Sequence, residues 1–185
     1  MQSTIRRQTD DSDRKLRELM LYIAAKSESD LDFGATKLNK ILFFADLTAF
    51  VRHEHSITGQ EYQALPRGPA PRRLLPVRKQ MEAQGECAIQ QAMRFGYQQR
   101  RLFALRPAEL SMFNGDEIAI VDEVMEFLSG KTAREISDMS HAFLDCWNGL
   151  EEGDKIPMEV GFVRSRPLTR AEARYATQLE PNLGR

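Results

Sequence analysis

The sequence contains only two cysteines and no run of apolar residues near the length that crosses a membrane. Cys87 and Cys146 lie far apart, and neither belongs to a C-x-x-C pair. This spacing fits neither a disulfide framework nor a zinc ribbon. A membrane-spanning helix needs about 20 consecutive, mostly apolar residues, and charged residues interrupt every candidate stretch. We therefore expect a cytoplasmic protein with free thiols and no membrane contact.

Motifs for catalysis and cofactor binding are also scarce. Arg67-Gly68-Pro69 lacks the length and the lysine of a phosphate-binding loop. His53-Glu54-His55 offers two imidazoles but no third ligand, so we expect no metal site. His141 and Cys146 lie five positions apart and point to different faces of a helix. We expect no enzyme activity and no cofactor, and a small hydrolase built on His141 and Cys146 is the alternative from another functional class.

Acidic and basic residues nearly balance over the 185 positions but are unevenly distributed. Residues 67–106 carry nine basic and two acidic side chains, whereas residues 107–162 carry three basic and thirteen acidic ones. Surfaces of opposite sign orient a charged partner, unless the two blocks neutralise each other across the fold. The pI of about 6.3 argues against an obligate nucleic-acid binder, so DNA is not the favoured partner.

Apolar periodicity predicts a compact, mainly helical α+β domain with one central, buried helix. The expected helices span about 13–26, 37–51, 71–84, 115–129, 132–140 and 142–147. The helix at 37–51 is apolar around nearly its whole circumference, so we expect it to be packed on several sides. Thr36 is its expected N-cap, and capping boxes are expected at Asn114 and Thr132.

Two extended runs, 87–93 and 97–105, flank Arg94-Phe95-Gly96 and predict a β-hairpin. A helix followed by a basic hairpin resembles the helix-and-wing part of winged-helix proteins. We expect three regions: an N-terminal extension over residues 1–13, one domain over residues 14–162 and a C-terminal arm over residues 163–185.

The basic helix and hairpin supply the candidate partner-binding surface. Its residues are Arg72, Arg73, Arg94, Phe95, Tyr97, Arg100 and Arg101. Exposed aromatic and arginine side chains tend to dominate the energy of protein interfaces. We therefore expect the hairpin tip to anchor a protein partner, the alternative being that Phe95 folds back into the core.

Asp46 lies in an apolar stretch, where an unpaired carboxylate is costly to bury. We expect it to make a structural hydrogen bond or ion pair, with an arginine of the Pro-rich loop at 66–71 as a candidate partner. Together with Lys37, Asn39 and Lys40, it should hold its helix against the segment from Tyr62 to Pro71.

The segments Thr36–Asp46, Ile57–Ala64 and Arg67–Pro71 resemble the SocA-like family, also called the Panacea domain. The family pattern is K-L-x-K-L-L-Y-F-A-D, then I-T-G-x-x-Y-x-A and G-P-V, and the resemblance extends over about residues 14–160. Phe43 and Ala70 stand where the family often has Tyr and Val. The family-motif residues are Lys37, Leu38, Lys40, Phe44, Asp46, Thr58, Gly59, Tyr62, Gly68, Pro69, His141 and Trp147.

The resemblance implies an antitoxin of a bacterial or phage toxin–antitoxin pair. Such a protein neutralises a cognate toxin by direct binding, and in some members by delivering the toxin to a protease. Family toxins are diverse, so the resemblance does not identify this toxin. The alternative function is a winged-helix-like DNA-binding regulator that uses residues 71–106, alone or to control its own expression.

Overall fold

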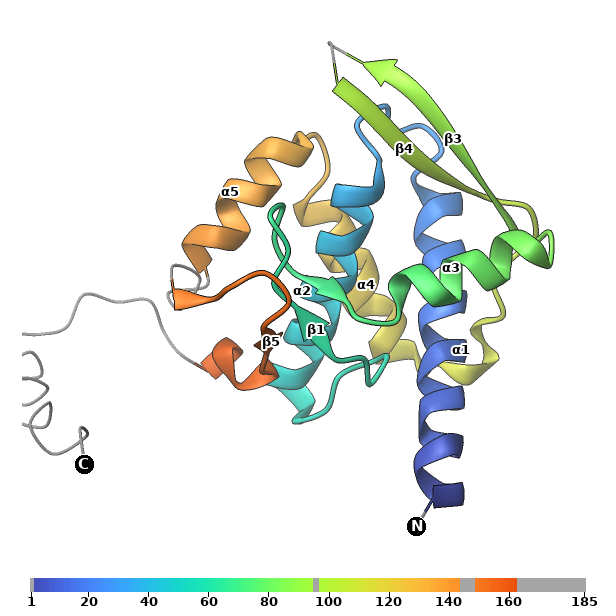
Figure 1. Cartoon of the computed structure of the whole chain (residues 1–185), viewed down its shortest axis with the longest axis vertical. Helices are drawn as coiled ribbons and strands as arrows, with labels where there is room; N and C mark the ends of the chain where they lie inside the picture. Colours follow the sequence, from blue (N-terminus) through green and yellow to red (C-terminus); the bar gives the residue numbers. More distant parts are fainter. Residues whose placement is uncertain (1, 95–96, 144–148, 163–185) are drawn as a thin grey trace, which may run out of the picture.

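The computed structural model describes residues 2–94, 97–143 and 149–162, and its elements are arranged as in Figure 1. Helices predominate, as predicted. The helices are α1 (Gln2–Lys26), α2 (Ala35–His53), α3 (Leu74–Ala83), α4 (Gly115–Phe127) and α5 (Ala133–Phe143), with short 3-10 helices η1 (Leu110–Met112) and η3 (Met158–Phe162). The strands are β1 (Tyr62–Gln63), β2 (Ala70–Pro71), β3 (Cys87–Arg94), β4 (Tyr97–Ala104) and β5 (Lys155–Ile156).

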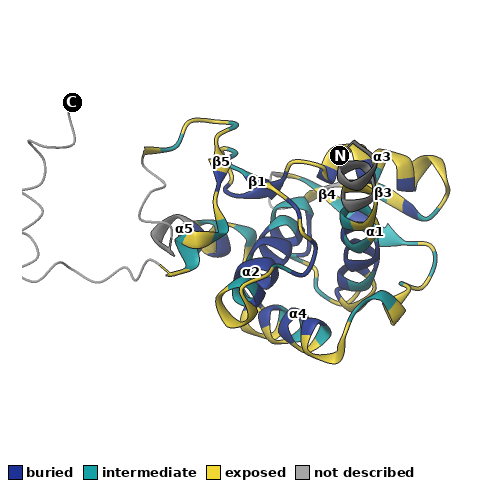
Figure 2. Ribbon diagram, turned by 90° about the horizontal axis from the view of Figure 1, so that it is seen from below, coloured by how far each residue is buried: buried dark blue, intermediate teal, exposed yellow. Residues whose placement is uncertain are grey.

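α2 is the central helix of the domain, as its apolar circumference predicted. Ten of its 19 residues are buried, and it contacts α1, α4, α5, β2, β4 and η3. The burial colours of Figure 2 show this helix enclosed by its neighbours. The main core combines residues of α1, α2, α3 and α4, and a smaller cluster around Phe43, Tyr62 and Ile156 joins α2 to β1 and β5. Side chains on different faces of α2 can therefore hold separate parts of the fold.

Capping boxes begin α4 and α5, as predicted. Asn114 accepts a hydrogen bond from the Glu117 N–H at 2.8 Å, while the Glu117 carboxylate accepts one from the Asn114 N–H at 2.9 Å. Thr132 and Glu135 form the same reciprocal pair at the start of α5. These bonds satisfy backbone donors that the first helical turn leaves free.

Three predicted helix starts were wrong. α2 begins at Ala35 after Gly34, with no side-chain cap, so Thr36 lies inside the first turn. Gly34 fits there because a Cβ would come within 3.0 Å of the Gln99 Cγ. α1 extends back to Gln2, through a stretch that lacks apolar periodicity. α3 begins only at Leu74, because the chain stays extended through β2 and the Arg72 N–H donates to the Glu61 carbonyl.

Two small antiparallel sheets complete the fold. The first has the order β2-β1-β5 and pairs Tyr62 with both Pro71 and Ile156, which brings distant parts of the chain together. The second is the predicted hairpin of β3 and β4, in register from Cys87↔Ala104 to Arg94↔Tyr97. In Figure 1 the hairpin extends beyond the ends of α1 and α2. β4 packs on these two helices, and β3 contacts α3.

Candidate functional site

The first polar cluster of the family motif surrounds Asp46, which is fully buried on α2. The Thr58 N–H donates to Oδ1 at 2.8 Å, and the hydroxyls of Thr58 and Tyr62 donate to Oδ2, Tyr62 at 2.7 Å. The predicted arginine partner was therefore wrong, because the loop after α2 and strand β1 supply the donors. Burial raises the pKa of Asp46 above its usual range, although the hydrogen bonds oppose this shift. Burial and the Asp46 carboxylate also raise the pKa of Tyr62.

The second cluster joins Lys40 to α5 and to the β1–β2 loop. Lys40 Nζ donates to the Ser140 Oγ at 2.7 Å, and both side chains are fully buried. Burial lowers the pKa of Lys40 to about 7. Gly68 passes directly over this ammonium with φ +103°, and a Cβ there would lie 1.5 Å from Nζ. Position 68 of the G-P motif is therefore glycine because any side chain there would collide with Lys40.

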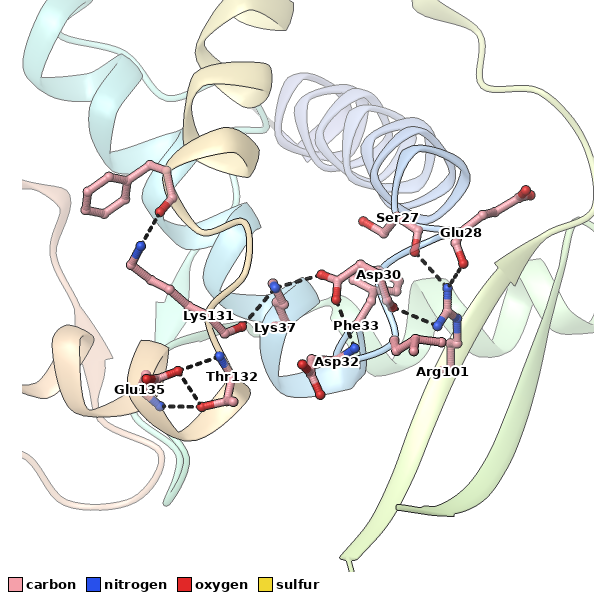
Figure 3. Close-up of polar contacts among 12 residues, drawn as sticks. Ser27, Glu28, Asp30, Asp32, Phe33, Lys37, Arg101, Lys131, Thr132 and Glu135 are labelled. Carbon is pink, nitrogen blue, oxygen red and sulfur yellow. Dashed lines mark hydrogen bonds and ion pairs between the residues drawn. The ribbon is translucent and has the colours of Figure 1, made fainter. Parts of the chain in front are cut away.

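The third cluster joins Lys37 to two loops (Figure 3). Its Nζ lies 2.7 Å from Asp30 Oδ2 in the α1–α2 loop and donates to the Lys131 carbonyl at 3.0 Å in the α4–α5 loop. Lys37 is 2% exposed, so these two partners hold a charge that is almost wholly buried. Asn39 was expected to take part, but its Oδ1 makes no hydrogen bond within the described residues.

Most motif residues thus lie inside the domain. The buried ones are Lys37, Leu38, Lys40, Asp46, Thr58, Tyr62, Gly68 and Pro69. Phe44 is half-buried and Gly59 is exposed. The His141 side chain and Trp147 lie outside the described residues. The described part of the motif therefore forms an internal framework that joins α2 to the surrounding loops, and a partner could contact little of it directly.

Several arginines of the predicted partner-binding surface have internal roles. Arg101 donates to the carbonyls of Ser27, Glu28 and Asp30 at 2.7–2.8 Å, just beyond the C-terminus of α1 (Figure 3). A guanidinium is favourable there because the last carbonyls of a helix carry partial negative charge. β4 is thereby fixed to the α1–α2 loop, and Arg101 has a structural role that its sequence position did not reveal.

Arg72 and Arg73 also have partners within the domain. Arg72 donates to the Gly153 carbonyl at 2.7 Å, and Arg73 pairs with Asp13 of α1 at 2.7 Å. Arg100 is exposed and has no partner within the described residues. The side chains of Arg94 and Tyr97, and all of Phe95, lie outside the described residues. Arg100 is therefore the described member of the predicted set that is free to meet a partner.

The charged side chains of the acidic and basic blocks form ion pairs mainly with residues of α1 and α2. Three carboxylates of α4 pair with α1 and α2, through Lys15–Glu117, Lys26–Asp122 and Arg52–Glu123 at 2.7–2.8 Å. Arg106, at the end of the hairpin, pairs with Glu18 at 2.6 Å and Glu86 at 2.9 Å. Burial raises the pKa of Glu18, but its hydrogen bonds from Arg106 and from the Glu109 N–H outweigh burial and leave the pKa lowered. The basic and acidic blocks are thus each partly neutralised through the N-terminal helices.

The described residues form no group of three potential metal ligands. The rings of His53 and His55 stack 6.0 Å apart at the end of α2. Burial and the Glu82 carboxylate raise the pKa of the Cys87 thiol to about 11, so this thiol is protonated at neutral pH. Cys146 lies outside the described residues. A shallow cleft of about 550 Å³ lies between the end of α2, the loop at 55–61 and η3, where Glu61 pairs with Lys155 at 2.5 Å.

No helix among the described residues is long and apolar enough to cross a membrane.

Sequence reasoning missed the partners of the two motif lysines. Ser140 follows the buried Ile136 by four positions, so it lies on the core-facing side of α5 and could have been identified as a polar residue facing inward. Asp30 carried no comparable signal, because its contact with Lys37 depends on the conformation of the α1–α2 loop.

A protein-family model described as "Antitoxin SocA-like, Panacea domain" matches residues 38–148, well over half of the chain. The match begins within α2 and includes the Lys40, Asp46 and Gly68 contacts described above. No curated protein and no solved structure matches the chain.

Proposed function

The chain belongs to the family of SocA-like antitoxins with a Panacea domain, and from this premise we propose that it neutralises a cognate toxin by direct protein–protein contact. The observation that carries the proposal is the family match over residues 38–148, which includes the Asp46 and Lys40 clusters. Delivery of the bound toxin to a protease is a second way in which the same contact could neutralise it. We assign the antitoxin domain to residues 14–162, flanked by residues 1–13 and the arm at 163–185.

The arrangement of polar groups supports a binding protein rather than an enzyme. Lys40 and Ser140 resemble a serine–lysine pair, in which the amine activates the hydroxyl as a nucleophile. Here the Ser140 hydroxyl donates to the Ser137 carbonyl at 2.8 Å, and Lys40 donates to Ser140. The lysine therefore acts as a donor to this hydroxyl, and both groups are fully buried, away from any substrate. The pair holds α5 against α2.

A winged-helix-like DNA-binding regulator is the second candidate. The observation in its favour is the projecting hairpin (Figure 1), on which Arg100 is exposed and has no partner among the described residues. Against it, Arg73, Arg101 and Arg106 bind groups within the domain and are not free to contact phosphates. A protein partner therefore accounts better for the described surface.

A growth experiment tests the proposed function. The protein encoded by the reading frame adjacent to this chain is expressed from an inducible promoter, with and without the chain. We expect the neighbour alone to stop growth and co-expression to restore it. A Gly68→Ala chain, in which the internal framework is disturbed, is tested in parallel as the control that shows whether rescue of growth depends on the folded domain. Continued growth arrest in the presence of soluble, folded chain would contradict the antitoxin function for this pair.

A titration against nonspecific duplex DNA at two salt concentrations tests the second candidate. Binding to phosphates weakens steeply as salt rises, because condensed counterions are released on binding. We expect no binding at physiological salt. Tight binding at low salt that weakens more than tenfold on raising the salt would favour the DNA-binding regulator.

A further inference from the structure

The hairpin has two unpaired edges within the described part of the chain, because β3 and β4 form a sheet of two strands. β4 packs on α1 and α2, whereas β3 is the outer strand and contacts α3 (Figure 1). Gln90, Gln91 and Met93 of β3 are exposed, Met93 to 73%. The outer edge of β3 is therefore accessible to another polypeptide.

The register identifies the free backbone groups on this edge. The Leu105 N–H donates to the Glu86 carbonyl at 2.8 Å, one position before the paired strands begin. Hydrogen-bonded and non-hydrogen-bonded pairs alternate along an antiparallel ladder. Counting from Glu86, the backbone N–H and C=O of Ile89, Gln91 and Met93 point away from β4. Within the described residues these groups make no backbone hydrogen bond to another element.

The β3 edge lacks the features that usually prevent strand addition. From Cys87 to Met93 it contains no charged residue, no proline and no glycine. Natural proteins protect exposed edges with charges, prolines, bulges or very short strands. β3 has eight residues, which exceeds the common strand length of about 5–6. An open edge of this length, uncharged over residues 87–93, is a template for an additional strand.

Charge indicates which kind of strand fits. Between residues 87 and 105 the chain carries only basic charged side chains, at positions 94, 100 and 101. Arg101 binds carbonyl groups rather than a carboxylate, and Arg100 has no partner within the described residues, so neither charge is neutralised. Pairing β3 with β3 of a second copy would bring two such sets together, which is unfavourable. An acidic segment would be attracted instead.

We propose that the toxin docks by adding an extended, net acidic segment to the outer edge of β3, alongside Ile89–Met93. This inference rests on the proposed function, and it specifies the surface and the kind of partner segment. Backbone hydrogen bonds to Ile89, Gln91 and Met93 hold the added strand. Ile89, Gln91 and Met93 lie on the same face of the hairpin, so the toxin residues beside Ile89 and Met93 on that face are apolar, and the residue beside Gln91 is polar.

Two proline variants form a matched test. Gln91→Pro removes an outward N–H from the β3 edge without removing a bond between β3 and β4. Gln98→Pro removes an outward N–H from the β4 edge, at the residue that pairs with Met93. Gln98 Nε2 donates to Gln91 Oε1 at 2.8 Å, so both variants lose the same side-chain contact. Gln91→Ala loses this contact but keeps the N–H.

Binding is measured by calorimetry with the purified protein of the adjacent reading frame that proves toxic in the growth experiment. Gln91→Pro is expected to weaken binding at least tenfold, and Gln98→Pro and Gln91→Ala less than threefold. If the wild-type chain binds and Gln91→Pro binds equally well, strand addition is wrong and the antitoxin function stands. If the wild-type chain does not bind this toxic protein, direct neutralisation fails and this inference fails with it.

Amide exchange in the wild-type complex tests the same point without a substitution. In the free chain the outward amides of Gln91 and Met93 should exchange at least tenfold faster than the inward amide of Gln90. Toxin should slow the two outward amides at least tenfold and leave the Gln98 amide unchanged. Unchanged exchange at Gln91 and Met93 overturns the proposal. Their protection in a dimer of the chain alone also overturns it, because a second copy then occupies the edge.

Discussion

Replacing Gly68 with alanine should destabilise the protein far more than an ordinary glycine substitution. Its φ of +103° is a conformation that side chains rarely adopt, and such strain costs about 1–3 kcal/mol. The new Cβ would also lie 1.5 Å from Lys40 Nζ and 2.8 Å from Cε. Lys40 is fully buried, so its ammonium cannot move aside without losing Ser140. The loss of this buried hydrogen bond costs about 1–3 kcal/mol, which together with the strain gives a total of about 2–6 kcal/mol.

Gly85→Ala is the matched control for this prediction. Gly85 also has positive φ, +70°, but apart from its two chain neighbours no atom of the described residues lies within 4 Å of the position that its Cβ would take. Its substitution should therefore cost only the backbone strain, about 1–2 kcal/mol. The free energies of unfolding are measured by urea denaturation, with far-ultraviolet circular dichroism as the signal.

A double-mutant cycle isolates the contact between Gly68 and Lys40. In a Lys40→Ala background the clash is absent, so adding Gly68→Ala should cost about as much as Gly85→Ala does. Equal losses for Gly68→Ala and Gly85→Ala in the wild-type background would refute the close approach of the lysine. A Gly68→Ala loss that stays the same in the Lys40→Ala background would refute it as well.

Three further predictions concern Asp46 and the arginines of the hairpin. Tyr62→Phe removes one donor from the buried Asp46 carboxylate and should lower the free energy of unfolding by about 1–3 kcal/mol, and a Tyr62→Phe protein of unchanged stability would contradict the cluster. The pKa of Asp46 is raised in the folded state, so the protein loses stability when this carboxyl group ionises. Relative to the Asp46→Asn variant, the free energy of unfolding of the wild-type protein should therefore fall as pH rises above 3.8, and a difference between the two proteins that does not vary with pH would contradict this. Arg100→Glu should weaken toxin binding and leave the thermal midpoint unchanged, whereas Arg101→Glu should lower stability by about 1–3 kcal/mol, and the reverse assignment would place Arg101 at the interface.

Local sequence signals predicted the helices and the hairpin well. The apolar circumference of α2 predicted its central position, and the Asn114 and Thr132 capping boxes begin α4 and α5 as expected. Gly96 within a short turn between extended runs predicted the hairpin of β3 and β4. These features depend on residues close together in the chain, which is why a single sequence reveals them.

Features that depend on distant contacts could not be predicted. β2 and β5 have two residues each, too few for a periodic signal, and β1 pairs with both of them, one of which lies far along the chain. Asp46 was predicted to have a polar partner, but the choice of Thr58 and Tyr62 depends on how the loop after α2 returns. Arg101 was predicted to belong to the partner-binding surface. Its bonds to the carbonyls beyond α1 could not be foreseen, because they form only when β4 packs across the end of that helix.

The central claim is that this chain neutralises a toxin by binding it. Its most direct test is light scattering after size exclusion, with the chain and the toxic protein of the adjacent reading frame purified separately and then mixed. We predict that the wild-type chain and the toxic protein form one complex of defined stoichiometry, with a mass that corresponds to whole numbers of each chain. Variants of the chain that no longer restore growth should not form this complex. Restored growth with no complex between the purified proteins would contradict neutralisation by direct contact.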